Sequence, residues 1–389
     1  MIYADNAATT KLSPAAYHTM TELLEDAWGN PSSLYGHGQR AKEVLEKARE
    51  DVAAVIGAQP EEIYFTSGGS EADNQAIRSA AVLGKKKGKM HIISSAFEHH
   101  AVLHTLKALE AEGFEVTLLD VHENGIVVPS EVEAALRENT CLVTIMTANN
   151  EIGTVQPIRE IGALCRARGV TFHTDAVQAV GHLPIDVKAQ GIDLLSMSGH
   201  KFHAPKGIGA LYVRQGVRIQ RLMQGGAQER NQRPGTENLA GIVGIGKAIE
   251  LATTDVEDRA AKMTAIRDHM IDRIMKEIPH VQLNGHPTKR MCGNVNVSFY
   301  FVESESILLH LDFKGIAASS GSACTSGSLD PSHVLLAIGV SHEHANGSVR
   351  LSLCEENTME EADYVVDSLA GIVKRLRDMS PLYEDFLKG

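Results

Sequence analysis

The chain has 389 residues, of which 43% are hydrophobic and 22% charged, a composition typical of globular proteins. This length is enough for two domains, because single hydrophobic cores stop growing near about 250–300 residues. The formal net charge of −12 argues against a nucleic-acid binder, and no apolar run approaches the roughly 18 residues of a membrane helix. The N-terminal segment 1–8 lacks the basic-then-apolar pattern of a secretory signal, so we expect a cytoplasmic protein with no membrane partner.

Helices and strands alternate between about residues 40 and 215. The sequence predicts an amphipathic helix over 36–58, a short strand over 62–68 and a helix over 70–88 that Ser70 caps. Further β-rich runs follow at 90–96, 115–121, 141–150, 170–178, 192–199 and 208–213. This alternation predicts a mainly parallel sheet covered on both faces, an α/β fold. The last two runs have little sequence between them and could add an antiparallel edge.

The pattern changes after about residue 255. A long charged helix over 255–278 precedes an alternating strand over 294–301, and a helix, a Gly/Ser-rich loop, further helix and a strand over 348–353 follow. A terminal amphipathic helix ends the chain. We therefore predict a large domain over 15–255, and a smaller α+β domain formed by 1–14 and 256–389.

Three predicted strands end where ligands of open α/β sheets bind. The first is followed by the small residues 67–71 at a helix start, where backbone N–H groups favour an anion such as a phosphate. Another ends at Asp175, a carboxylate that needs a cationic partner such as a protonated pyridine nitrogen. A third is followed by Lys201, whose amine could bond an aldehyde if desolvation lowers its pKa.

Each of these features also has a simpler explanation. Segment 67–71 could be a tight turn with a serine cap, Asp175 a helix cap and Lys201 a solvated lysine at a strand end. The combination favours the ligand interpretation, because a phosphate cradle, an anion and an amine follow three strands of one sheet. Together they suit pyridoxal 5'-phosphate.

At this point the motifs resemble a known family. "SGHK" (198–201), with the upstream "DA-x-Q" (175–178), "EHH" (98–100), "NNEIG" (149–153) and "RPGTEN" (233–238), is similar to the class V aminotransferase group of fold-type-I pyridoxal-phosphate enzymes. Within that group the chain resembles the cysteine desulfurases that serve iron–sulfur cluster assembly. The segment "ASSGSACTSG" (318–327) resembles their long-loop subgroup, and the resemblance runs over nearly the whole chain.

The resemblance implies a role for each matched residue. Lys201 would carry the cofactor, Asp175 would bind its ring nitrogen, and Gln178 its ring hydroxyl. His99 would stack on the ring and help to move protons. The implied phosphate contacts are Gly69, Ser70, Ser198, His200 and, from the other subunit of a homodimer, Thr236. Asn150 and Arg350 would grip the carboxylate of the substrate, a task that suits the planar arginine fork.

Cys324 lies in a loop with almost no large apolar side chain, so we expect this loop to be mobile and the thiol accessible. The resemblance implies that Cys324 takes sulfur from L-cysteine as a persulfide, releases L-alanine, and passes the sulfur to an acceptor protein. The sequence does not say which acceptor this is: an iron–sulfur scaffold, a tRNA-thiolation protein or another carrier. Cys141, Cys165 and Cys292 are assigned to packing. Cys354 follows the strand at 348–353, and the run Cys354-Glu355-Glu356 departs from the small residue and arginine usual in the family.

Metal binding and other activities were also weighed. The five cysteines form no Cys-x-x-Cys pair, and the histidine clusters lack a zinc-protease spacing, so no metal is predicted. A selenocysteine lyase or a class V aminotransferase remains the alternative enzyme. A sulfur-relay or scaffold protein without catalysis is the alternative of another class.

Overall fold

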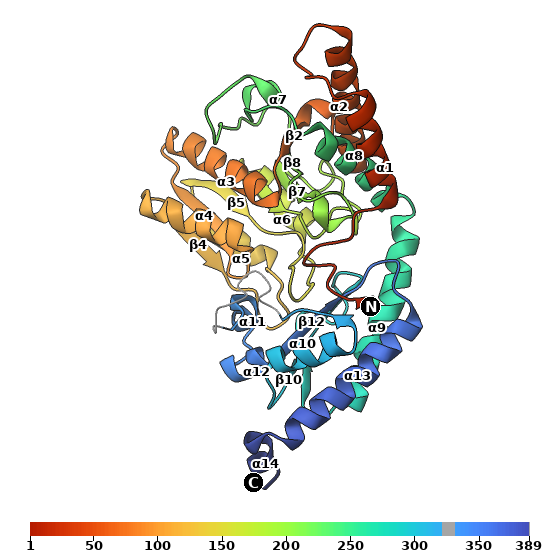
Figure 1. The fold of residues 1–389 in the computed structure, drawn as a ribbon. Helices are drawn as coiled ribbons and strands as arrows, with labels where there is room; N and C mark the ends of the chain where they lie inside the picture. The colour runs from red at the N-terminus through yellow and green to blue at the C-terminus, as the bar shows by residue number, and fades with distance from the viewer. Residues whose placement is uncertain (321–330, 389) are drawn as a thin grey trace.

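The computed structural model describes residues 1–320 and 331–388. Its largest element is a seven-stranded sheet with the order β2-β8-β7-β6-β5-β3-β4 (Figure 1). Its strands are β2 (Ile63–Thr66), β3 (His91–Ser95), β4 (Glu115–Leu119), β5 (Thr140–Thr144), β6 (Thr171–Asp175), β7 (Leu194–Ser198) and β8 (Gly209–Val213). Strands β7, β6, β5, β3 and β4 are parallel, which confirms the predicted α/β sheet.

The expected antiparallel pair exists, but it does not form the edge of the sheet. β8 runs antiparallel to β7, and β2 pairs antiparallel with the other side of β8, from Ile63↔Tyr212 to Thr66↔Gly209. β2 is therefore the edge strand. The expected edge was wrong because β2 and β8 lie far apart in the sequence, and no local pattern reports such a pairing.

Helices cover both faces of this sheet. They are α1 (Pro14–Asp26), α2 (Gly36–Val55), α3 (Gly69–Lys85), α4 (His100–Ala111), α5 (Pro129–Ala135), α6 (Ile158–Arg168), α7 (Gln228–Asn231) and α8 (Leu239–Thr253), with short 3-10 turns η1 (Pro60–Glu62) and η2 (Gly199–Lys201). Ile93 of β3 packs in one core with residues of α2, α6 and α8, whereas its neighbour Ile92 packs with α3 and α4 on the opposite face. Since successive strand residues point to opposite faces, a sheet buried on both sides needs continuous apolar runs.

Helix α3 begins differently from the prediction. The helix starts at Gly69 with Gly68 as its N-cap, and no side chain caps it. Ser70 lies inside the first turn, so its predicted capping role is wrong. The backbone N–H groups of this turn are consequently not covered by a capping side chain.

A second core lies beside the first, toward the chain's two ends (Figure 1). β10 (Asn294–Phe299) pairs antiparallel with β12 (Ser348–Ser352) and β9 (Val281–Leu283), and β1 (Ile2–Tyr3) pairs parallel with β11 (Ile316–Ala317). The helices of this region are α9 (Val256–Glu277), α10 (Ser304–Phe313), α11 (His333–Ala337), α12 (His342–Asn346), α13 (Met359–Asp378) and α14 (Pro381–Lys388). Ala4 joins this core, whereas Val334 and Leu335 of α11 pack into the first. The smaller α+β region is confirmed, and its proposed boundaries at 14 and 255 stay a prediction.

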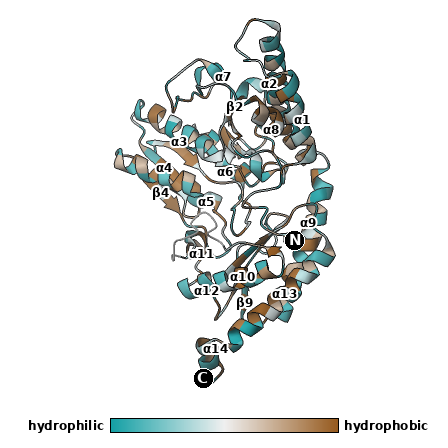
Figure 2. Ribbon diagram, in the orientation of Figure 1, coloured by the Kyte–Doolittle hydropathy of each residue, from teal (hydrophilic) through white to brown (hydrophobic). Residues whose placement is uncertain are grey.

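Figure 2 shows hydrophilic and hydrophobic residues together along α9 and α13, as expected for helices with one face on a core. Buried residues on the inner face of α13 include Val366, Leu369 and Val373. Within residues 1–320 and 331–388, no helix has both the length and the apolar character needed to cross a membrane.

Candidate active site

The start of α3 packs against the ends of β6 and β7. A Cβ atom added at Gly69 would lie 2.5 Å from Cγ2 of Val177 and 3.5 Å from Cβ of Ser198. A Cβ at Gly68 would lie 3.6 Å from Oγ of Ser198. The absence of a side chain at Gly69 therefore lets the helix start approach the strand ends, and its unblocked N–H groups suit an anion. Gly69, Ser70 and Ser198 of the predicted phosphate set meet here.

An ion pair braces this helix start. The backbone N–H of Ser67 donates to Glu71 Oε2 at 2.8 Å, and Arg233 Nε donates to Glu71 Oε1 at 2.9 Å. Burial opposes ionisation of Glu71, but these hydrogen bonds outweigh it and lower its pKa. Arg233 thereby ties the loop before α8 to α3, and Thr236 lies exposed in that loop. Its expected role in a second subunit stays a prediction.

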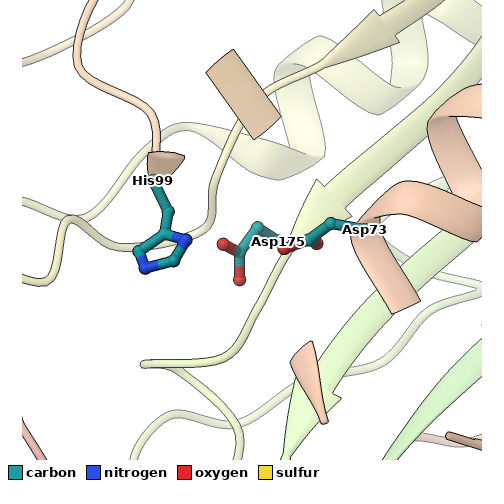
Figure 3. A group of neighbouring side chains, drawn as sticks. All are labelled: Asp73, His99 and Asp175. Atoms are coloured by element: carbon teal, nitrogen blue, oxygen red, sulfur yellow. The ribbon is translucent and has the colours of Figure 1, made fainter. Parts of the chain in front are cut away.

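Asp175 lies at the end of β6 in a buried group with His99 and Asp73 (Figure 3). The potential ligand atoms of these three residues all lie within 4.8 Å of one another. The N–H of Val177 donates to Asp175 Oδ1 at 2.9 Å, and burial raises the pKa of both carboxyls. Sequence analysis missed Asp73, which lies inside a helix rather than after a strand.

His99 is the N-cap of α4, and its Nδ1 accepts the N–H of Ala101 at 3.1 Å. In the neutral ring the proton must therefore lie on Nε2. Burial, and secondarily the charge of Lys201, lowers the His99 pKa to about 4. His99 thus offers a neutral ring with an Nε2–H donor near Asp175.

Lys201 ends the η2 turn directly after β7. Its Nζ donates to the carbonyls of Ala7 at 2.6 Å and Ala8 at 2.9 Å. Gln178 Nε2 also donates to the Ala7 carbonyl, at 3.0 Å. Nearby, His200 Nδ1 lies 3.1 Å from Thr9 Oγ1. Lys201, Gln178 and His200, three predicted cofactor residues, therefore all contact the N-terminal segment 5–10. Most of these contacts are to backbone carbonyls, which the amino-acid sequence does not reveal.

Arg350 lies on β12 and is only 2% exposed. Its Nη1 donates to the backbone carbonyl of Asn150 at 2.9 Å, and its Nη2 lies 3.0 Å from Asp5 Oδ1. The Nε atom is buried and has no hydrogen-bond partner within the described residues. The predicted carboxylate-binding pair is thus brought together, and Asp5 is a further member that the sequence analysis did not single out.

Cys324 lies outside the described residues, but both neighbouring segments are described. Ser319 forms a backbone bridge with Arg350, with N–H···O distances of 3.2 and 2.6 Å. On the other side, Ser332 hydrogen-bonds to Glu151, and His333 Nε2 lies 3.0 Å from the Glu98 carbonyl. The segment that carries Cys324 therefore begins beside the predicted substrate arginine and ends beside the residue before His99.

The other cysteines are buried. Cys141, Cys165 and Cys292 are at most 7% exposed, which confirms that they belong to packing. Burial raises the pKa of Cys141 to about 11 and that of Cys165 to about 12, so neither is a reactive thiolate at neutral pH.

Comparison with known proteins identifies the family of this chain. The family described as aminotransferase class-V matches residues 2–365. The chain belongs to this family. Within the class V group, cysteine desulfurase IscS of Methanosarcina thermophila is 54% identical over 381 residues, covering 98% of this chain and 94% of that protein. Cysteine desulfurase IscS of Clostridium botulinum (strain Hall) is 52% identical over 389 residues, covering 100% and 98%.

Solved class V structures agree with this fold. A structure titled "NifS-like protein" is 36% identical, with a TM-score of 0.90, over 96% of this chain and 99% of that one. A structure titled "SspA in complex with cysteine" is 37% identical, with a TM-score of 0.80, over 92% and 100%. The predicted fold, a large parallel-sheet domain with a smaller α+β part, is therefore confirmed.

This class V chain has its own arrangement at the run 354–356. Glu355 Oε1 lies 2.6 Å from Arg259 Nη2 of α9, and Glu355 Oε2 lies 3.6 Å from His203 Nε2. Burial opposes ionisation of Glu355, but its partners outweigh burial and lower its pKa to about 2. Where the family usually has an arginine, this chain carries an anion with its own cationic partners. Arg350 and its contacts remain in place.

Proposed function

We propose that this chain is a cysteine desulfurase that works with bound pyridoxal 5'-phosphate. The observation that carries the proposal is the convergence of Lys201, Asp175 and the unblocked start of α3 on one site. The names of relatives at 52–54% identity support the same activity. No property of the site favours a different cofactor chemistry as strongly.

The donor set fits each part of the cofactor. Lys201 supplies an amine for the aldehyde, and buried Asp175 supplies a carboxyl for the ring nitrogen. Asp73 Oδ1 is buried and has no hydrogen-bond partner among the described residues, so the site contains a polar atom that a cofactor could satisfy. The remaining proposed contacts are Gly69, Ser70, Ser198, His200 and Thr236 for the phosphate, Gln178 for the hydroxyl and His99 for the ring face. When bound, the cofactor withdraws electrons from the substrate Cα.

The chain's own groups then bind the substrate and move protons. The Lys201 amine takes the Cα proton, and the carbonyls of Ala7 and Ala8 accept hydrogen bonds from that amine and orient it. Neutral His99 offers its Nε2–H to a nearby acceptor. Arg350 binds the substrate carboxylate, and its contact with the Asn150 carbonyl fixes the guanidinium plane.

Cys324 completes the reaction. Its thiolate attacks the substrate sulfur and an S–S bond forms. The C–S bond breaks with its electron pair left on the substrate carbon, which takes up a proton, so that L-alanine leaves and a persulfide remains on Cys324. The persulfide sulfur passes to the thiol of an acceptor protein, such as an iron–sulfur scaffold or a tRNA-thiolation protein. The anchoring of the flanking residues Ser319 and Ser332 beside Arg350 and Glu151 supports this role. We also propose a cytoplasmic homodimer in which Thr236 reaches the partner's phosphate site.

The test is incubation with L-cysteine and a thiol reductant, with sulfide and alanine both measured. Cys324→Ala should lose nearly all sulfide release while keeping the visible absorbance of bound cofactor. Cys165→Ala is the matched control, because Cys165 is 0% exposed in α6, and it should keep the activity. Equal sulfide from Cys324→Ala and the parent would overturn the persulfide step.

The alternatives are separated by three further measurements: aminotransferase activity, the rate on selenocysteine and the cofactor absorbance. A class V aminotransferase would keep full activity in Cys324→Ala, and a selenocysteine lyase would act much faster on selenocysteine than on cysteine. A relay or scaffold protein without catalysis would show no cofactor absorbance after purification with pyridoxal phosphate present.

A further inference from the structure

The proposed mechanism gives no role to Asp73, a buried acid beside Asp175. Asp73 lies one turn into α3 and is 1% exposed. Figure 3 shows Asp73 reaching from α3 toward Asp175 at the end of β6, with His99 on the other side of Asp175. A carboxyl in this position is costly to bury, so its proton and its partners need an explanation.

No cation balances Asp73 through its described contacts. Asp73 Oδ1 lacks a hydrogen-bond partner within the described residues, and the nearest imidazole nitrogen, His173 Nε2, is 3.7 Å away. The His173 nitrogens lie 2.8 Å from Thr144 Oγ1 and 3.0 Å from Ser196 Oγ. Burial lowers the pKa of His173 to about 3, so this ring is neutral at physiological pH.

The other titratable groups around the two carboxyls come from three further segments. Burial and the carboxyls of Asp175 and Glu98 raise the pKa of Asp73, whereas Ser196 lowers it. Burial raises the pKa of Asp175, whereas the N–H of Val177 and the charge of Lys201 lower it. Neutral His99 faces both. The only cation in this set lies on the Asp175 side.

Two neighbouring buried carboxyls cannot both ionise cheaply, because the first charge raises the proton affinity of the second site. Ionised Asp175 has Lys201 and the Val177 N–H to stabilise it, whereas Asp73 has neither. Without cofactor, the pair should therefore carry one negative charge and one proton. A cation placed against Asp175 would stabilise a second negative charge on the pair, so the pair could then release its proton.

We propose that Asp73 and Asp175 act as one acid pair that stores a proton and gives it to the ring nitrogen of the arriving cofactor. The inference rests on the proposed function. An O–H bond of the pair breaks and an N–H bond forms, the pair goes from one negative charge to two, and the ring goes from neutral to one positive charge. Asp73 is a positioning residue in this scheme, because it acts on the ring through Asp175.

The first experiment uses the chain freed of cofactor and infrared spectroscopy in a mildly alkaline buffer. In the difference spectrum, wild type should show one protonated-carboxyl band that Asp73→Asn lacks, since asparagine has a similar shape and cannot titrate; the signal of protonated Glu98 is common to both and cancels. Asp193→Asn is the control, because Asp193 is another buried aspartate of this domain but is paired with Arg214. An unchanged carboxyl band in Asp73→Asn would overturn the inference. The band in wild type should also disappear on adding pyridoxal phosphate, a test that needs no variant to fold.

The second experiment counts protons by calorimetry of pyridoxal phosphate binding in buffers of different ionisation enthalpy. Asp73→Asn should take up close to one more proton per site from solvent than wild type does. Equal uptake by a wild type and a variant that both bind would overturn the inference and leave the proposed function standing. A wild-type chain that does not bind pyridoxal phosphate would instead overturn the proposed function, and the inference with it.

Discussion

At the scale of single residues, burial sets the protonation of the acids near the site. Glu98 is 0% exposed, and burial raises its pKa to about 8 although Ser95 and the N–H of Met146 donate to it. An unperturbed glutamate titrates near 4.5, so the folded chain holds an extra proton between these values. The stability contributed by this group is complete below the unfolded pKa and is lost as pH rises through about 8.

Glu98→Gln should therefore reduce the loss of stability at alkaline pH. The amide resembles the protonated acid but cannot ionise. In wild type the free energy of unfolding should fall between acidic and alkaline buffer, and in the variant this fall should be smaller by about 3–5 kcal/mol. Urea unfolding at both pH values measures this difference. Glu61→Gln, at an exposed site in η1, is the control and should behave as wild type. A parallel fall in Glu98→Gln and wild type would contradict the argument.

Arg350→Lys should weaken substrate binding far more than turnover. A lysine cannot reach both the Asn150 carbonyl and Asp5 while presenting a planar fork, so the KM for L-cysteine should rise about tenfold to a hundredfold. Steady-state alanine formation separates KM from kcat. Arg267→Lys is a matched control, because Arg267 is equally buried but binds the carbonyls of Arg290 and Met291. An unchanged KM in Arg350→Lys would argue against its binding role.

The rule that ligands bind at strand ends and the family resemblance together supplied the predicted site residues, but neither pointed to Asp73 or Asp5. Asp175 and Lys201 follow directly from the rule that ligands bind at strand ends. Asp73 carried a weaker signal, a charged residue on the apolar face of α3 four positions before buried Ile77. Asp5 carried none, because its importance depends on contact with Arg350 at the opposite end of the chain.

At the scale of elements, the start of α3 is the feature most sensitive to side-chain volume. Gly69→Ala would place a Cβ atom 2.5 Å from Cγ2 of Val177, closer than non-bonded carbon atoms pack, so the helix start or Val177 must shift. Because the proposed phosphate site is built from these N–H groups, we expect the dissociation constant for pyridoxal phosphate to rise at least about tenfold. Fluorescence titration of the cofactor-free chain measures it.

Gly36→Ala is the matched control for this element. Gly36 is also the first residue of its helix, α2, but a Cβ there meets nothing within 4 Å. The control should bind the cofactor as wild type does. Similar losses in the two variants would show that helix propensity, and not the close approach to Val177, explains the effect.

Local pattern predicted most elements because most strands of the sheet are short, largely buried β-rich runs between helical segments. The pattern did not predict the start of α3, since serine is the better capping residue in isolation. In the structure Gly68 is the N-cap, and the next residue, Gly69, packs on Val177. The sequence pattern also could not predict that β2 lies at the sheet edge, because β2 pairs with β8, which follows it only after most of the large domain's sequence.

At the scale of the whole molecule, the run 354–356 links the two cores. Glu355 follows β12 of the smaller sheet, Arg259 lies at the start of α9, and His203 follows the Lys201 turn. Burial disfavours the charged form of His203, but Glu355 outweighs it and raises the His203 pKa. The ionic contact thus joins the cofactor turn to the second core.

Glu355→Gln should weaken this link in a pH-dependent way. The stability from Glu355 exists above its unfolded pKa and is lost as pH falls toward about 2, whereas that from charged His203 is lost as pH rises through its raised pKa. Both partners are charged in mildly acidic buffer, so the melting temperature should drop more there than at alkaline pH. Scanning calorimetry measures both conditions. Glu356→Gln, at the exposed neighbouring position, should change neither, and an equal drop at both pH values in Glu355→Gln would exclude His203 from the link.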